Sequence, residues 1–170
     1  VLNNVLELGT GSGAIIIALL NETINIKAIA TDISYEAIYM AKKNAIINNV
    51  ENKVQFICCN WLDSFVNLNF DLIIANPPYI KSEDINELEP EVKNYDPIAA
   101  LDGGTDGLEE YRNICGAIKE KRKKKIAVLF EIGYDQASEV SSIMKNNNFM
   151  ELEIFKDYEN NDRCIFGISN

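Results

Sequence analysis

Short apolar segments alternate with longer amphipathic segments along most of this chain. Apolar runs of four to eight residues predict buried strands, and apolar residues spaced by three or four predict helices. The predicted strands span residues 4–8, 27–31, 54–59, 70–75 and 126–132, and the predicted helices span 14–20, 105–119 and 137–145, with one more after Ser34 whose Ala37, Ala41 and Ala45 share a face. This alternation predicts an α/β fold, with a mostly parallel sheet and helices on both faces.

Three details complete the predicted arrangement. Two strand-like runs, 149–157 and 163–168, follow one another around Glu159-Asn160-Asn161, which predicts an antiparallel hairpin at the sheet edge. Residues 80–104 are acidic and interrupted by Pro and Gly, so we expect an irregular flap there. Ser34 and Thr105 are the expected N-caps of the helices that follow them.

Length and charge limit the classes of function. The 170 residues suit one domain with a single core, and because the chain starts at Val1 we interpret it as a catalytic fragment. Its 16 basic and 26 acidic residues give a net charge of −10, which disfavours nucleic acid as a substrate. No apolar run reaches the roughly 20 residues of a membrane helix, and no signal peptide is evident. We therefore expect a cytoplasmic protein, and nothing in the sequence requires more than a monomer.

The chain contains no His, and its four Cys (58, 59, 115 and 164) form no C-x-x-C pair. A metal site is therefore not expected, and the thiols are interpreted as reduced cytosolic side chains. The absence of His removes the commonest general base. Any chemistry must proceed without a Ser-His or Cys-His pair.

A Gly-rich turn follows the first predicted strand, in the segment Glu7-Leu8-Gly9-Thr10-Gly11-Ser12-Gly13. Glycines allow close approach of a ligand, and the next helix directs free N–H groups at it. Asp32, nineteen residues after Gly13, ends the second strand, where a carboxylate can accept both hydroxyls of a ribose. The G-x-G-x-G spacing favours S-adenosyl-L-methionine over NAD, and a turn without ligand is the third alternative. Ile33 is included among the predicted cofactor contacts.

Asn60-Trp61 follows the third predicted strand, whose end would lie beside Asp32. Trp61 would stack on an adenine ring and Asn60 would hydrogen-bond to its exocyclic amine. The alternative is that Trp61 is a core aromatic residue.

The most specific motif is Asn76-Pro77-Pro78-Tyr79, at the end of the fourth predicted strand. The prolines stop the strand and hold Asn76 extended. The Asn76 side-chain oxygen and the Pro77 carbonyl can then accept from one NH2 group. This geometry would aim the lone pair of a delocalised, poorly nucleophilic nitrogen at a methyl donor. Tyr79 would stack on the flat substrate. A rigid turn without chemistry is the alternative.

Together, the two motifs resemble Rossmann-like, class I methyltransferases of the N-P-P-Y group. The resemblance narrows to release factor glutamine methyltransferases of the HemK type through Tyr95-Asp96-Pro97, Ala100-Leu101, Gly103-Gly104, Asp106-Gly107-Leu108, Glu131-Ile132-Gly133 with Gln136, and Asp162-Arg163. It implies a seven-stranded sheet and methylation of the glutamine amide in the Gly-Gly-Gln loop of a peptide chain release factor, which makes the release factor the expected partner.

The resemblance also implies roles for individual residues. Cofactor contacts would come from Gly9, Thr10, Gly11, Gly13, Asp32 and Trp61; Asn76 would contact cofactor and substrate, and Pro77, Pro78 and Tyr79 would hold the glutamine. The chain departs from the family in four places: the N-terminal helical docking domain is missing, Asp96 replaces a usual Glu, Asn60 replaces a frequent Asp, and a basic run at 119–125 replaces a turn usually rich in Gly or Pro.

Several alternatives remain at the level of sequence. N-P-P-Y suits an exocyclic amine of adenine or guanine in nucleic acid equally well. Two further alternative functions are an inactive cofactor-binding module and an NAD oxidoreductase. The run Lys119-Glu120-Lys121-Arg122-Lys123-Lys124-Lys125 is either a solvated loop or a contact for RNA or an acidic partner.

Overall fold

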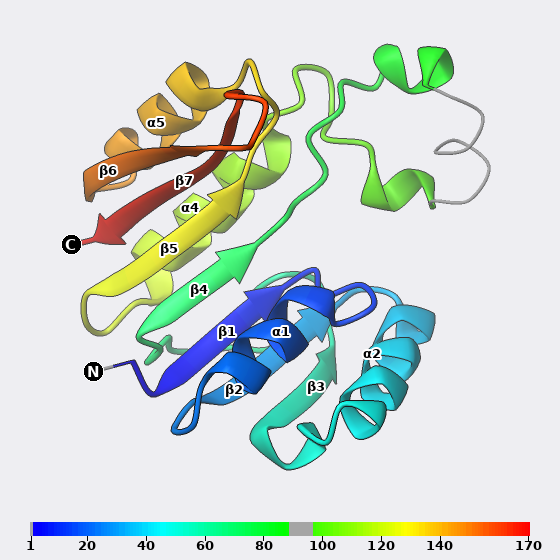
Figure 1. The fold of residues 1–170 in the computed structure, drawn as a ribbon. Coiled ribbons are helices and arrows are strands. Elements are labelled where there is room, and N and C mark those ends of the chain that lie inside the picture. Colours follow the sequence, from blue (N-terminus) through cyan, green and yellow to red (C-terminus); the bar gives the residue numbers. More distant parts are fainter. Residues whose placement is uncertain (1, 89–96) are drawn as a thin grey trace.

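The computed structural model describes residues 2–88 and 97–170, which fold into one α/β unit (Figure 1). Within these residues, seven strands form one sheet in the order β3-β2-β1-β4-β5-β7-β6. The strands are β1 (Asn4–Leu8), β2 (Lys27–Asp32), β3 (Val54–Cys58), β4 (Leu72–Ala75), β5 (Ile126–Glu131), β6 (Phe149–Lys156) and β7 (Asp162–Ser169). The five strands from β3 to β5 pair in parallel, and β7 pairs antiparallel with both β5 and β6. The predicted fold class and edge hairpin are confirmed.

Helices cover both faces of the sheet, as the pattern predicts. The helices α1 (Ala14–Glu22) and α2 (Tyr35–Ile47) cover one face, and α4 (Glu109–Lys121) and α5 (Ala137–Asn146) cover the other (Figure 1). Each face has its own buried apolar cluster, with Ile16 and Leu20 of α1 in one and Tyr111 and Ile114 of α4 in the other. None of the helices in the described part of the chain is long and apolar enough to cross a membrane.

The two predicted caps have opposite outcomes. Ser34 caps α2, because its hydroxyl accepts from the Ala37 N–H at 3.2 Å. The prediction that Thr105 caps the next helix is wrong, because α4 begins only at Glu109. Gly104 and Gly107 have positive φ angles of 86° and 73°, which no right-handed helix contains. The chain therefore turns through residues 104–108 before it becomes helical.

The segment predicted as a flap contains only short 3₁₀ turns in its described part, at Asp84–Glu87 and Ile98–Ala100. The two ends of this segment are joined by backbone hydrogen bonds: Ile80 N donates to Leu101 O, and Gly103 N donates to Ile80 O. The predicted family residues Tyr95 and Asp96 lie outside the described residues. This segment leaves the carboxyl end of β4 and therefore stands beside the tetrapeptide.

Candidate active site

The Gly-rich loop joins β1 to α1 at the carboxyl edge of the sheet. Gly9, Gly11 and Gly13 have positive φ angles of 67°, 54° and 81°, a backbone shape that other residues rarely adopt. A Cβ at Gly9 would lie 3.2 Å from the Trp61 ring, and one at Gly13 would lie 3.2 Å from Ala41 Cβ. A Cβ at Gly11, by contrast, would meet no atom within 4 Å. The loop is thus tightly packed at both ends and open at its centre.

Asp32 fastens this loop to the start of α2. One carboxylate oxygen accepts from Gly11 N at 2.8 Å and the other accepts from Ser34 N at 2.9 Å. Each oxygen keeps a further lone pair for a ligand hydroxyl. Ile33 follows Asp32 in the chain, and 67% of its surface is exposed. Its side chain is therefore accessible to a ligand.

Glu7 lies buried beneath the loop, with 2% of its surface exposed. The Thr10 hydroxyl donates a hydrogen bond to its carboxylate. Burial raises the pKa of Glu7 from 4.5 to about 7, and the hydrogen bonds from Thr10 and from the Ile16 backbone oppose that increase. The charged side chains at the loop, Glu7 and Asp32, are both acidic, which suits a cationic ligand and disfavours the pyrophosphate of NAD.

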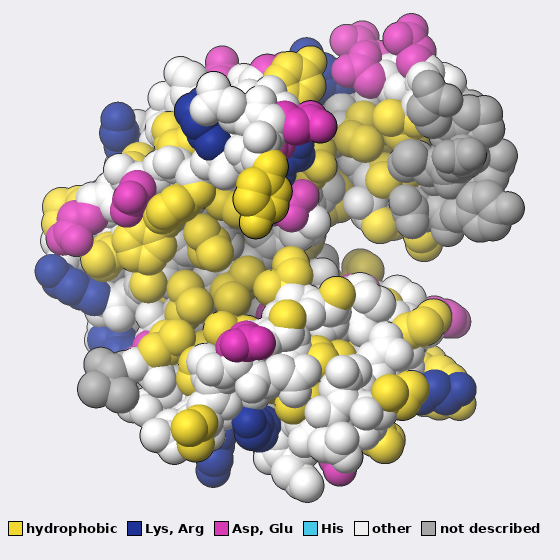
Figure 2. All heavy atoms as spheres, viewed as in Figure 1, with side chains coloured by type: hydrophobic (Ala, Val, Ile, Leu, Met, Phe, Trp, Pro, Cys, Tyr) yellow, Lys and Arg dark blue, Asp and Glu magenta, His cyan; other side chains and the backbone are white. Residues whose placement is uncertain are grey.

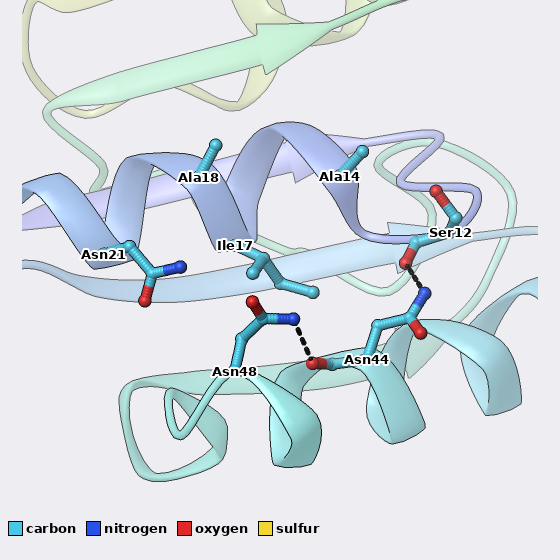
Figure 3. A pocket seen from close by; sticks show the side chains of 7 residues that line it. All are labelled: Ser12, Ala14, Ile17, Ala18, Asn21, Asn44 and Asn48. Atoms are coloured by element: carbon cyan, nitrogen blue, oxygen red, sulfur yellow. Dashed lines mark hydrogen bonds between the residues drawn. The ribbon is translucent and has the colours of Figure 1, made fainter.

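A groove behind the loop supports it from the other side. It lies between α1 and α2 and is lined by Ser12, Ala14, Ile17, Ala18, Asn21, Asn44 and Asn48 (Figure 3). Asn44 donates to Ser12 O at 2.8 Å, and Asn48 donates to Asn44 O at the same distance. The Asn44 hydrogen bond joins α2 to the Gly-rich loop, and the Asn48 hydrogen bond caps the end of α2. The groove therefore supports the candidate site and does not form a second one.

Trp61 lies between the Gly-rich loop and α4. Its indole N–H donates to the Glu110 carboxylate at 2.6 Å, and its ring packs against Gly9 and the core. Asn60 is exposed at the end of β3. The sequence did not indicate Glu110, because a Glu in the first turn of a helix is ordinary. Adenine stacking on Trp61 stays a prediction.

The tetrapeptide leaves β4 directly beside the loop, because Leu8 pairs with Ala75 in the parallel ladder. A Cβ at Gly9 would lie 4.0 Å from Asn76 O. Asn76 is exposed, Pro77 is buried and Tyr79 is half-buried. Figure 2 shows the molecule hollowed here, between the lobe that contains residues 80–88 and 97–104 and the lobe of α1 and α2. The structure thus brings the two predicted motifs together at the crevice where open α/β sheets bind ligands.

The Gln136 side chain hydrogen-bonds to the last residue of the tetrapeptide. Its side-chain nitrogen donates to Tyr79 O at 3.0 Å and to Gly107 O at 3.2 Å, and its oxygen accepts from Gly133 N at 3.1 Å. Gly107 is required here, since a Cβ would lie 2.5 Å from Tyr79 O. Sequence reasoning noted Gln136 only as part of a family resemblance and gave it no role in the site.

The predicted basic run covers the end of α4, which runs to Lys121, and the loop of residues 122–125 before β5, at the end of the parallel strands opposite to the tetrapeptide. The interpretation of the whole run as a loop is therefore wrong for residues 119–121. Lys121 donates to Leu62 O, Arg122 donates to Asn170 O, and Lys124 forms an ion pair with Asp71 at 2.5 Å. Lys119 donates to Asn146 O. Most of these cations therefore hold neighbouring backbone or side-chain groups. This agrees with a structural role for the run.

Several solved structures with this fold are methyltransferases. The structure of a ribosomal protein L11 methylase from Lactobacillus delbrueckii subsp. bulgaricus matches 97% of this chain and 68% of its own chain, with a TM-score of 0.64 and 22% identity. That of an RNA methyltransferase from Salinibacter ruber, in complex with S-adenosyl-L-homocysteine, matches 98% and 80%, with a TM-score of 0.61 and 14% identity. The fold is therefore that of class I methyltransferases.

Sequence comparison shows to which family of methyltransferases the chain is similar. Residues 1–89 match the Methyltransferase small domain family. The release factor glutamine methyltransferase of Agrobacterium fabrum is 43% identical to this chain, and the match covers 95% of this chain and 55% of the relative. The release factor glutamine methyltransferase of Fusobacterium nucleatum is 45% identical, and that match covers 95% of this chain and 46% of the relative. A bifunctional methyltransferase of Rickettsia typhi is 43% identical over 95% of this chain and 31% of its length. The chain belongs to the Methyltransferase small domain family and spans about half the length of the first two relatives.

Proposed function

We propose that residues 1–170 form the catalytic domain of an S-adenosyl-L-methionine-dependent enzyme that methylates the glutamine side-chain amide in the Gly-Gly-Gln motif of peptide chain release factors. The observation that carries this proposal is the position of Asn76-Pro77-Pro78-Tyr79 directly beside the start of the Gly-rich loop, with Asn76 next to Gly9. The similarity to two release factor glutamine methyltransferases over 95% of the chain supports the choice of substrate.

The residues of the loop fit this cofactor. Asp32 would accept from the ribose hydroxyls, and Gly11 leaves space for a ligand. Acidic Glu7 lies buried below the loop, where its charge would favour a cationic amino-acid end. Ile33, Asn60 and Trp61 would surround the adenine. When bound, S-adenosyl-L-methionine supplies a methyl group activated by its sulfonium.

The residues of the tetrapeptide would prepare the amide for that transfer. Asn76 Oδ1 and the Pro77 carbonyl would accept from the two N–H bonds, which holds the nitrogen in place and raises its electron density. Tyr79 and Pro78 would enclose the flat amide and exclude water. The amide nitrogen becomes acidic once it carries the methyl group, so its proton can leave to solvent without a strong base.

The proposed partner is a protein and not a nucleic acid. The basic run lies at the far edge of the sheet from the tetrapeptide, and four of its cations already hold other groups. A flipped base with its phosphate backbone would instead need a basic groove around the site. The reaction would take place in the cytoplasm, where translation occurs, with the enzyme acting as a monomer.

Mass spectrometry of the substrate tests this proposal. A purified release factor is incubated with S-adenosyl-L-methionine and the protein, with Asn76→Ala as the control. We expect one methyl group on the Gly-Gly-Gln glutamine with the unchanged protein and none with the variant. Methylation of an adenine-containing oligonucleotide, with the release factor unmodified, would replace the proposed substrate by a nucleic acid.

A further inference from the structure

Trp61 has a backbone conformation that is unusual for a residue with a large side chain. Its φ angle is 38°, in the left-handed region that favours glycine. Such a conformation costs free energy and persists only where surrounding contacts hold it, most often at functional sites. Trp61 is also the residue that the proposed function places against the adenine of S-adenosyl-L-methionine. The contacts that hold its ring would therefore shape the cofactor site.

Two contacts hold the indole, each at a different edge. Cζ3 and Cη2 of the six-membered ring fill the space beside Gly9, where a Cβ would lie 3.2 and 3.5 Å from them. At the pyrrole edge, Nε1–H donates to Oε2 of Glu110 at 2.6 Å. Glu110 lies in the first turn of α4, so the ring spans the distance between the Gly-rich loop and that helix.

The ring is not held by packing alone. A cavity of about 270 Å³ adjoins Trp61, with Leu62 and Ala117 among its other walls. The torsion between a Cβ atom and an aromatic ring has a broad, roughly twofold distribution, so a ring beside open space can tilt or turn over. The bond to Glu110 removes this freedom, because the indole has one N–H and only that edge can donate.

We propose that Glu110 is a positioning residue, which fixes the tilt of the Trp61 ring so that one face of the indole can stack on the adenine of the cofactor. This inference rests on the proposed function and adds a residue to its cofactor site. Glu110 acts through the hydrogen bond to the indole and not on the reacting atoms.

The Glu110 carboxylate is itself held in place. Its Oε2 also accepts from Asn113 Nδ2 at 3.3 Å, within the same helix. The start of α4 is joined to the segment that follows the tetrapeptide, since Glu109 N donates to Gly103 O at 3.1 Å and Gly103 N donates to Ile80 O at 2.8 Å. A carboxylate anchored in this way loses little further freedom when it accepts from the indole, so the bond can hold the ring.

The first test reads the indole without any substrate. Trp61 is the only tryptophan in the sequence, so its Nε1–H gives a single indole signal in a ¹H–¹⁵N NMR spectrum. We expect this proton to lie downfield and to exchange slowly in wild type. It should move upfield in Glu110→Leu and stay close to wild type in Glu110→Gln, which keeps an acceptor. An indole signal that is the same in wild type and Glu110→Leu would overturn the inference.

The second test measures cofactor binding by calorimetry. Glu110→Leu should raise the Kd for S-adenosyl-L-methionine by about three- to tenfold, because part of the stacking on the adenine is lost. Glu110→Gln should bring the Kd back to within about twofold of wild type, since its side-chain oxygen can accept from the indole. Glu120→Leu, at an exposed glutamate near the other end of α4, is the matched control and should bind the cofactor as wild type does.

A double-mutant cycle shows through which group Glu110 acts. Trp61→Phe keeps an aromatic ring and removes the N–H. If Glu110 acts through the indole, Glu110→Leu should change the Kd of the Trp61→Phe protein by less than about twofold. A rise of about three- to tenfold in both backgrounds would mean that Glu110 supports the fold independently of Trp61, and would overturn the inference.

These tests are separate from the test of the proposed function. If wild type binds S-adenosyl-L-methionine but transfers no methyl group to a release factor, the proposed substrate is wrong, and the Kd values still decide the role of Glu110. If wild type methylates the release factor and Glu110→Leu keeps the wild-type Kd, the proposed function stands and the positioning role is refuted.

Discussion

The two sides of the crevice are built in different ways. The Gly-rich loop is held by groups close to it in the chain: Asp32 contacts Gly11 across 21 positions, and Asn44 contacts Ser12 across 32. The tetrapeptide is held from further away, since Gln136 contacts Tyr79 across 57 positions. The cofactor side is thus mainly local, and the substrate side depends on the assembled sheet.

Because the two sides are held by different contacts, we expect substitutions on them to have different effects. Changes on the loop side should alter the affinity for the cofactor and leave the reacting geometry in place. Changes on the tetrapeptide side should alter turnover and leave cofactor affinity in place. The following variants test that division, from the largest expected effect to the smallest.

Asn76→Ala should give the largest change. Loss of one of the two acceptors for the substrate NH2 should lower kcat by about 1000-fold. Calorimetry should show an affinity for S-adenosyl-L-methionine within about twofold of wild type. Asn52→Ala, an exposed amide in the 3₁₀ turn before β3, is the matched control. Near-normal turnover of Asn76→Ala would refute the two-acceptor arrangement.

Glu7→Gln should change how stability depends on pH. Because the pKa of Glu7 is raised from 4.5 to about 7, the folded state holds this proton more tightly than the unfolded state does. The stabilising contribution is therefore complete below pH 4.5 and is lost as the pH rises through 7. The difference is about 3 kcal/mol. Urea unfolding at pH 5 and pH 8 measures it. The same pH dependence in Glu7→Gln as in wild type would assign it to other groups.

Gln136→Leu should destabilise the protein and impair turnover together. The substitution leaves the Tyr79 and Gly107 carbonyls and the Gly133 N–H without their partner, at a cost of about 2 kcal/mol. Denaturant unfolding and steady-state kinetics measure the two effects. The exposed Gln55 of β3 offers a control, Gln55→Leu. A Gln136→Leu protein with weakened cofactor binding and normal kcat would contradict the division between the two sides.

Asp32→Ala should mainly weaken cofactor binding. The variant loses the acceptor for the ribose and the two hydrogen bonds that hold Gly11 and Ser34. We expect the Kd for S-adenosyl-L-methionine to rise about tenfold, with kcat at saturating cofactor nearly unchanged. Calorimetry checks this, with Glu51→Ala, an exposed acidic residue before β3, as the control. An unchanged Kd would remove Asp32 from the ribose site.

The basic run should give the smallest effect. Replacing Lys123 and Lys125 by Gln should leave methylation of an isolated release factor within about twofold of wild type, because both side chains are exposed at the far edge. Lys124→Gln removes the ion pair with Asp71, whose pKa that pair lowers to about 2, and should cost less than about 1 kcal/mol. A large loss of activity would show that this run contacts the substrate.

Much of the fold was predictable because each strand and helix carries its own pattern. The runs at 4–8 and 126–132 match β1 and β5 within one residue, and the hairpin was predicted from the missing helix between its strands. The start of α4 was missed at Thr105, where a good capping residue lies between two glycines with left-handed backbone, Gly104 and Gly107. A cap preference worth about 1 kcal/mol cannot extend a helix through such a turn.

The candidate site was predictable to the extent that it is local. The Gly-rich loop, Asp32 and the tetrapeptide are contiguous motifs, and the structure brings them together. Glu110 and Gln136 act through contacts that exist only once the sheet is assembled, and no spacing in the sequence indicates them. Residue identity shows what a side chain can do, whereas its partner is decided by tertiary structure.

The position of β7 between β5 and β6 has a consequence for biosynthesis. A ribosome releases the Gly-rich loop and the tetrapeptide early, but Asp157 and Arg163 leave it much later. A nascent chain that stops before Arg163 would contain both motifs and still lack β7, the strand that pairs with β5 and with β6. Methyl transfer would then begin only after β7 has been translated, so truncated products would contain the reactive motifs without their activity.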